Sequence, residues 1–262
     1  MPATLTITPN TADASFSITA GSLSGITSLS LTRNDPDGSS SPVRSATNVV
    51  TGGATTLAFF DYEAPLDSTV SYTLTPNTGS PVTSATSSIV TDGQTYWLKN
   101  VAQETLSRKV EVADMSAVVR PARILATYPV LGRKNPVVIS DVRSGRVGMM
   151  KLNTYTATEA ADLRELFAMG LPLLFQAPAL TGFADMYFVA GDLAEIWPGS
   201  ALSPERRWEI PFTEVDSPTD DLVAIGNNSW AKVAQFGTGS RLLAKRTSWL
   251  DVLNRPFTQA DA

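Results

Sequence analysis

The sequence of 262 residues contains no cysteine and no histidine. Without thiols, the chain cannot form disulfide bridges, thiolate zinc sites or cysteine nucleophiles. Without imidazole, it has no Ser-His-Asp triad, no histidine-ligated metal and no histidine base near neutral pH. An enzyme built from this chain would depend on carboxylates, Lys, Tyr, Ser or Thr. The two absences therefore count against catalysis, and we expect no cofactor and no metal site.

Basic residues are also scarce, and long apolar runs are missing. The formal net charge of −5 counts against a nucleic-acid partner, because phosphate contacts need clustered Lys and Arg. The opening residues MPATLTITPN lack a charged region followed by an apolar one, so we expect no signal peptide. The most apolar stretch, residues 167–184, is interrupted by Pro172 and Pro178 and is too broken to span a bilayer.

Residues 1–98 form a first zone that is rich in hydroxyl side chains. Of the first 100 residues, 35 are Ser or Thr and only three are Lys or Arg. Short runs alternate apolar and polar residues, as in SFSITA with Phe16 and Ile18, and turn sequences such as NDPDGSS and PNTGSP separate them. A period of two is typical of half-buried strands. We expect a β-sandwich of about seven strands rather than a disordered linker, which would lack this alternation.

Residues 99–216 form a second zone, in which strands surround one helix near 157–169. Thr156 and Glu159 have the spacing of a capping box, Gly170 is well placed just after the helix, and Pro172 prevents its continuation. An apolar face at i, i+3 and i+4 is formed by Leu163, Leu166 and Phe167. We expect an α+β domain, built as an antiparallel sheet or a split barrel with one helix across it.

Residues 217–262 form a third zone, which reads as a C-terminal extension with short helices. Ser248 and Asp251 have capping-box spacing. The large apolar residues of this zone are candidate assembly anchors: Trp230, Phe236, Trp249 and Leu253. Such residues need a surface that buries them, either the second zone of the same chain or a neighbouring subunit.

A basic and glycine-containing stretch, residues 129–154, could hold phosphate or turn a corner in a sheet. It lacks the spacing of a Walker loop, and neither Gly145 nor Gly148 leads into a helix whose N-terminus could face a phosphate. We therefore expect a β-turn at 141–146, with Gly145 supplying an unusual dihedral. Its basic side chains are solvated or pair with carboxylates across a subunit contact: Arg133, Lys134, Arg143 and Arg146.

Two pairs of residues in the first zone are candidates for binding or chemistry. Asp61 and Glu63 lie on one face of an extended segment, where two carboxylates could share a proton or a metal, although most such pairs are solvated surface groups. Tyr96 and Trp97 could form a sugar platform, but burial in a core or an interface is the favoured interpretation.

The segment EAPLDSTVSYTLTP, residues 63–76, resembles the part of a fibronectin type III domain in which a loop leads into a strand with a core tyrosine. The resemblance covers about the first 98 residues. It implies that Tyr72 packs its ring in the core and hydrogen-bonds nearby backbone through its hydroxyl.

Residues 94–216 resemble the minor tail proteins of long-tailed actinobacterial phages. The resemblance rests on YWLKN and LSRKVEV, then on YPVLGRKNPVVISDVRSGRVGMMKLNT, and finally on the helix, GLPLLFQAP, YFVAGDLAEIWPG and RRWEIPFTEVDSP. The strand–helix–strand core is also similar to the ring-forming domain of distal tail proteins. The match covers nearly half of the chain.

The resemblance implies a structural role in the virion without catalysis, in a ring at the tail tip or baseplate that joins tail tube to tip. The implied partners are further copies of the chain, in a hexamer or trimer, and other tail proteins such as tube, tip hub and tape measure. One alternative is a tail-tip adhesin that binds host cell-wall glycans through residues 1–98. Another is a carboxylate-based cell-wall hydrolase.

Overall fold

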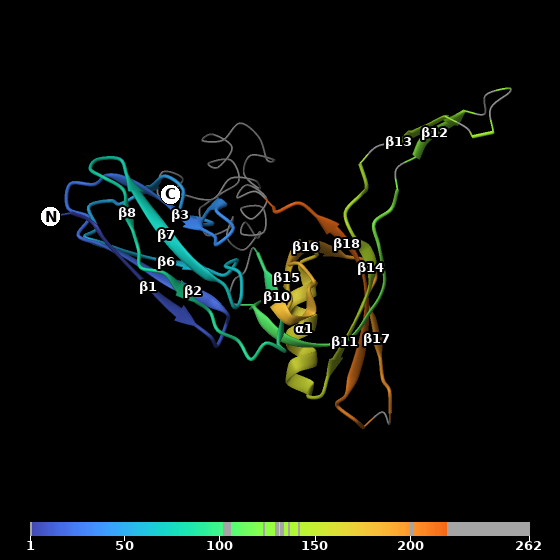
Figure 1. The fold of residues 1–262 in the computed structure, drawn as a ribbon. Coiled ribbons are helices and arrows are strands. Elements are labelled where there is room, and N and C mark those ends of the chain that lie inside the picture. Colours follow the sequence, from blue (N-terminus) through green and yellow to red (C-terminus); the bar gives the residue numbers. More distant parts are fainter. Residues whose placement is uncertain are drawn as a thin grey trace, which may run out of the picture. The chain divides into compact units, whose positions relative to one another are not determined.

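A computed structural model of the chain describes residues 2–101, 106–122, 124–128, 131, 134–135, 137–140, 142–199 and 202–218. The fold is mainly β, and the described residues include one α-helix (Figure 1). They divide into two compact units. Unit 1 holds the described residues up to 109, residues 174–185 and residue 218, and unit 2 holds the described residues of 110–173 and 186–217. No helix among the described residues has the length and apolarity needed to span a bilayer.

Unit 1 contains two antiparallel sheets. One has the strand order β1-β2-β6, and the other has the order β4-β3-β7-β8, with β5 beside β3 and β9 beside β7. The strands are β1 (Thr4–Asn10), β2 (Ser15–Gly21), β3 (Ser28–Asn34), β4 (Ser40–Pro42), β5 (Val49–Val50), β6 (Thr56–Asp61), β7 (Thr69–Pro76), β8 (Val82–Thr83) and β9 (Ser87–Ser88). The same unit holds β10 (Tyr96–Asn100), β15 (Leu173–Gln176, of which Leu173 is assigned to unit 2) and the 3-10 turn η2 (Ala179–Thr181).

The core of unit 1 follows from the alternation along its strands. In β7 the burial pattern switches at every residue from Thr69 to Pro76, so its apolar side chains all point to one face. Phe16 of β2 and Tyr72 of β7 meet edge to face, with ring centroids 5.7 Å apart. The two sheets therefore share one apolar core, as the period-two pattern predicts.

Unit 2 is an antiparallel sheet covered by one helix. In it β14 pairs with β11 and β18, and β18 also pairs with β16 and β17. The elements are β11 (Arg108–Val119), β12 (Ile124–Tyr128), β13 (Val137–Ser140), β14 (Val147–Thr154), α1 (Ala157–Ala168), β16 (Met186–Ala190), β17 (Ala194–Ile196) and β18 (Arg206–Val215). The helix α1 packs on β14. The buried apolar side chains of the sheet include Met150, Leu152, Trp208 and Ile210.

The helix begins and ends where its sequence predicts. Thr156 is the N-cap, and its Oγ1 accepts a hydrogen bond from the Glu159 amide at 3.1 Å. The Glu159 carboxylate reaches back to the amide of Tyr155, one residue before the cap. Gly170 has φ +62°, a conformation that favours glycine and ends the helix. The predicted face of Leu163, Leu166 and Phe167 is buried.

The strands β12 and β13 pair only with each other among the described strands. Figure 1 shows them as a two-stranded ribbon that continues from β11 and returns to β14. We call residues 120–143 the arm. A two-stranded ribbon without a third strand or a covering helix is marginally stable in water. The arm therefore differs from the rest of unit 2, where every strand has a place in the larger sheet.

Candidate functional site

The predicted carboxylate pair Asp61 and Glu63 lies in unit 1, but each carboxylate is held by its own partners. Asp61 is 3 % exposed, and its Oδ2 accepts hydrogen bonds from Arg33 Nη1 at 3.0 Å and from the Tyr72 hydroxyl at 2.9 Å. Its Oδ1 accepts the amide of Glu63 at 2.9 Å. Both oxygens of Asp61 are therefore engaged by donors, and Tyr72 bonds a carboxylate where the sequence predicts backbone.

These contacts change the acid–base properties of the neighbours of Asp61. Burial, together with the negative charge of Asp61, raises the pKa of the Tyr72 hydroxyl well above its ordinary value. Burial alone would lower the pKa of Arg33, but Asp61 and Asp35 outweigh it, so the pKa of Arg33 is raised. The arrangement keeps Tyr72 neutral and Arg33 charged.

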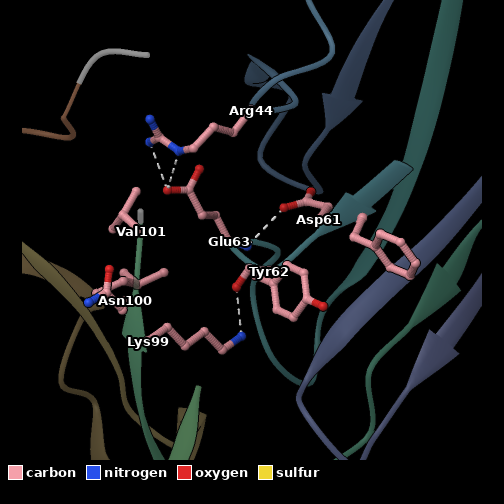
Figure 2. A pocket seen from close by; sticks show the side chains of 9 residues that line it. Arg44, Asp61, Tyr62, Glu63, Lys99, Asn100 and Val101 are labelled. Carbon is pink, nitrogen blue, oxygen red and sulfur yellow. Dashed lines mark hydrogen bonds and ion pairs between the residues drawn. The ribbon is translucent and has the colours of Figure 1, made fainter. Parts of the chain in front are cut away.

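Glu63 is paired with Arg44 at the edge of the same unit. Arg44 donates from Nε and Nη2 to Glu63 Oε1, at 3.1 and 2.8 Å, and from Nη1 to the carbonyl oxygen of Pro218 at 2.9 Å. A single guanidinium thus links the loop after β4, the loop after β6 and residue 218. Figure 2 shows Arg44 over Glu63, with Asp61 on the other side of the Glu63 backbone.

Lys99 is the buried cation of unit 1, with a side chain that comes from β10 and 2 % exposure. Its Nζ donates to the carbonyl oxygen of Ala14 at 2.6 Å and to that of Tyr62 at 2.7 Å. Figure 2 shows the bond to Tyr62. Burial lowers its pKa from 10.5 to about 8, and the nearby carboxylates, led by Asp61, reverse the effect only in part. Lys99 ties β10 to two loops of the sheets through backbone carbonyls.

The space beside this cluster is small. Its cavity volume is about 10 Å³, and it is lined by Arg44, Phe60, Asp61, Tyr62, Glu63, Lys99, Asn100, Val101 and Leu174. A volume of this size holds about one water molecule, whereas ligand pockets occupy about 300–1,000 Å³. Both oxygens of Asp61 are already hydrogen-bonded, Glu63 is paired with Arg44, and the space beside them is smaller than a sugar ring needs, so the geometry is that of two largely buried ion pairs.

The described residues contain no cluster of metal-ligating side chains, and they form a larger groove. No group of three or more Asp or Glu side chains among them is arranged to hold a metal ion. A larger groove of about 460 Å³ lies at one end of the sheets, lined by Pro2, Ala3, Ser24, Gly25, Ile26, Pro76, Thr78, Gly79, Ser80, Pro81 and Val82. Neither an aromatic nor an ionisable side chain lines that groove, so its lining offers no charged group and no ring on which a ligand could stack.

The predicted aromatic pair is built into unit 1. Trp97 is 2 % exposed and belongs to the core cluster. Tyr96 is half-buried and stacks on Phe175 of β15, with ring centroids 5.6 Å apart. The interpretation of Trp97 as a core residue is confirmed. Neither ring lies free as a platform for a sugar.

The base of the arm corrects two expectations. Gly145 does not adopt a positive φ, so the predicted unusual dihedral is wrong. The position needs glycine for space instead, because a Cβ there would lie 3.0 Å from the carbonyl oxygen of Glu214. Arg146 is buried and meets its carboxylate within the chain, with Nη2 donating to Glu214 Oε1 at 2.7 Å. The sequence predicts that Arg146 is either solvated or paired with a carboxylate across a subunit contact, whereas the structure buries it and pairs it with Glu214 of the same chain.

The arm itself exposes both apolar and basic side chains. Lys134 and Arg143 are exposed, and Arg143 donates to the carbonyl oxygen of Arg120 at 3.2 Å, across the base of the arm. The large apolar side chains that are more than two-fifths exposed in the arm are Tyr128, Leu131, Val137, Ile139 and Val142. No sheet or helix of the described residues covers them.

Several predicted positions lie outside the described residues. They are Arg133 of the arm and the four candidate anchors of the third zone: Trp230, Phe236, Trp249 and Leu253. Their roles stay predictions.

Sequence reasoning missed the lysine cluster and a second cluster in unit 2. In the second, Glu195 accepts from Arg164 and Arg206, and the Arg206 guanidinium lies 3.9 Å from the centre of the half-exposed Trp197 ring. The one sequence signal for Lys99 was its place in YWLKN, a charge among apolar residues at a strand end. Nothing in the sequence joins Glu195 to Arg164, which lie on different elements.

Comparisons with known proteins leave the family open. A scan against protein-family models finds no match, and a search of curated proteins finds no similar sequence.

Proposed function

We propose that this chain is a structural protein of a phage tail tip or baseplate, where copies form a ring that connects the tail tube to the tip. In this proposal the chain performs no catalysis, and its localisation is the virion. Its partners are further copies of itself and neighbouring tail proteins. The sequence support is the resemblance of residues 94–216 to minor tail and distal tail proteins.

The observation that carries the proposal is the arm. Its apolar side chains, such as Tyr128 at 54 % exposure and Leu131 at 104 %, are solvated in the single chain. Exposed apolar side chains grouped on one element mark a contact with another molecule. A two-stranded ribbon also gains stability when its edges or faces are covered. A protein that assembles through this element fits both observations.

Unit 1 supports the fibronectin type III-like part of the proposal. Its two antiparallel sheets share one core, β6 crosses back to β2, and the tyrosine of the resemblance, Tyr72, is fully buried. Two sheets of this size with Greek-key connections are the architecture of fibronectin-like sandwiches.

The alternatives gain no such support. The candidate sugar platform of the adhesin hypothesis was Tyr96 and Trp97, of which Trp97 is buried in the core and Tyr96 is stacked on Phe175. The hydrolase hypothesis relied on Asp61 and Glu63. Asp61 is paired with Arg33 and Glu63 with Arg44, beside a cavity that holds about one water molecule.

The test is to locate the chain in virions. Antibody against unit 1, applied to purified phage particles and viewed by electron microscopy, should label the tail end opposite the head. Mass spectrometry of the same particles should detect peptides of the chain. Label along the capsid, or a chain that is missing from the particles, would contradict the proposal.

A further inference from the structure

Charge is distributed unevenly between the arm and the rest of the chain. Of 20 basic and 25 acidic residues, five basic and one acidic lie in residues 120–143, which leaves 15 and 24 for the rest. Unit 2 outside the arm, counted over 110–119, 144–173 and 186–217, carries 11 acidic and five basic residues. The arm is therefore a net basic segment with exposed apolar side chains, and the rest of unit 2 is net acidic.

This distribution limits how two copies can meet through the arm. A two-fold contact of arm on arm would place two basic elements within a screening length of about 8–10 Å, and like charges repel at that range. A contact of arm on body places opposite charges together and steers the encounter. The charges favour a head-to-tail contact, in which one surface of the chain binds a different surface of the next copy.

The solvent-facing side of α1 has the chemistry to receive the arm. It exposes Glu159 and Glu165, and Asp162 lies partly exposed beside them. Three exposed alanines, Ala157, Ala161 and Ala168, form a stripe of small side chains beside Glu165 and leave room there for apolar groups. One basic residue, Arg164, shares this side, and Glu195 already pairs with it at less than 3.2 Å.

From these observations we propose that the arm of one copy docks on the α1 side of the next. The contact pairs Lys134 and Arg143 with the acidic side chains of α1, and Tyr128 and Ile139 cover its alanines. This inference rests on the proposed function, because it names the contact through which the ring closes. A head-to-tail contact closes into a ring when its rotation allows.

The test measures self-association of the full chain by sedimentation velocity. Raising NaCl from about 0.1 M to about 1 M shortens the screening length from about 10 Å to about 3 Å, and it should weaken association. The double variant Lys134→Glu/Arg143→Glu should weaken it by about tenfold or more, since two attractions become repulsions. The matched control Lys109→Glu/Arg207→Glu makes the same charge change at exposed sites outside the arm, and it should associate like the wild type.

A mixing experiment tests the direction of the contact. The variant Asp162→Lys/Glu165→Lys should also associate weakly alone, because its acceptor side is reversed. Mixed with the arm variant, each chain offers the intact surface that the other lacks, so association should return. Circular dichroism on each variant separates lost contact from lost folding.

Each of the following results would overturn the inference. Association that strengthens with salt and in the arm variant indicates a two-fold contact of arm on arm. Association that ignores the arm variant places the contact elsewhere. A wild-type chain that stays monomeric at every salt concentration has no second copy as its partner. If the chain is found in tails and the arm variant still assembles there, the inference fails alone. If the chain is missing from virions, the proposed function fails.

Discussion

The Nζ atom of Lys99 lies 2.6 Å from the carbonyl oxygen of Ala14, a residue 85 positions earlier in the chain. A second carbonyl, that of Tyr62, accepts from the same ammonium at 2.7 Å. Both hydrogen bonds are made out of contact with bulk water, because Lys99 is 2 % exposed. These two hydrogen bonds connect β10 to loops of the sheets of unit 1. Because burial lowers the pKa of Lys99, the stability of unit 1 should depend on pH.

Lys99 should make stability rise with pH in alkaline solution. Its pKa falls to about 8 in the folded chain, from 10.5 when unfolded, so between these values the unfolded chain binds more protons and rising pH favours folding. Below pH 8 the lysine is protonated in both states, and its burial penalty is fully present. The free energy of unfolding, measured by urea titration, should rise from pH 8 to pH 10 in the wild type relative to Lys99→Met. The full effect of the shift is on the order of 3 kcal/mol. A constant difference between the two proteins would contradict the assignment.

Removal of the Tyr72 hydroxyl should destabilise unit 1. The variant Tyr72→Phe takes a donor from the buried Asp61, which is left with an oxygen that is less well paired. We expect a loss of about 1–3 kcal/mol in the free energy of unfolding, measured by urea titration at pH 7. The control Tyr155→Phe removes a similar bond, from an exposed tyrosine to Glu111, and should lose less than about 0.5 kcal/mol. Equal losses would show that burial does not set the effect.

Gly145→Ala should destabilise unit 2. The new Cβ meets the carbonyl oxygen of Glu214 at 3.0 Å and the Cβ of Glu214 at 3.2 Å, so the Glu214 segment must move by a few tenths of an ångström to make room. A loss of about 1–3 kcal/mol is expected by differential scanning calorimetry. At Gly199 an added Cβ meets nothing within 4 Å, so Gly199→Ala should leave the melting temperature nearly unchanged. A neutral Gly145→Ala would mean that the two segments separate easily.

The Arg146–Glu214 pair should make unit 2 sensitive to acid. The hydrogen bond from Arg146 is the main cause that lowers the pKa of Glu214, so the pair stabilises the fold above the ordinary glutamate pKa. That stability is lost as pH falls through the lowered value. Glu214→Gln should lose about 1–2 kcal/mol at pH 7 by urea titration, and the difference from wild type should vanish in acid. Glu209→Gln, which loses only a 3.7 Å contact with Lys151, should change little at any pH.

The apolar side chains of the arm should matter for assembly and not for folding of the single chain. Tyr128→Ser/Ile139→Ser should weaken self-association in sedimentation experiments, because the two side chains have no covering partner within the described chain. The melting temperature of the monomer should stay close to that of the wild type. Val50→Ser/Val90→Ser changes two exposed apolar residues of unit 1 and should leave assembly intact. A fall in melting temperature for the arm variant would assign these residues to the fold instead.

Features that depend on neighbouring residues could be predicted from the sequence, whereas features that depend on residues far apart in the chain could not. The sequence alone determined the alternating strands of unit 1, the burial of Tyr72, and the helix that begins after Thr156 and ends before Gly170. Each of these depends on side-chain period, or on caps within a few residues, and consecutive residues record both.

Tertiary structure alone decided which partners the charged side chains have and which side chains of the arm are exposed. Asp61 and Glu63 look like a free pair in sequence, and only the fold brings Arg33 and Arg44 to them from 28 and 19 residues away. Gly145 shows its need for space only once Glu214 lies against it, and the apolar residues of the arm are exposed only because no other strand joins β12 and β13. Such contacts join residues far apart in the chain, and their distances are set by how the sheets pair and not by local pattern.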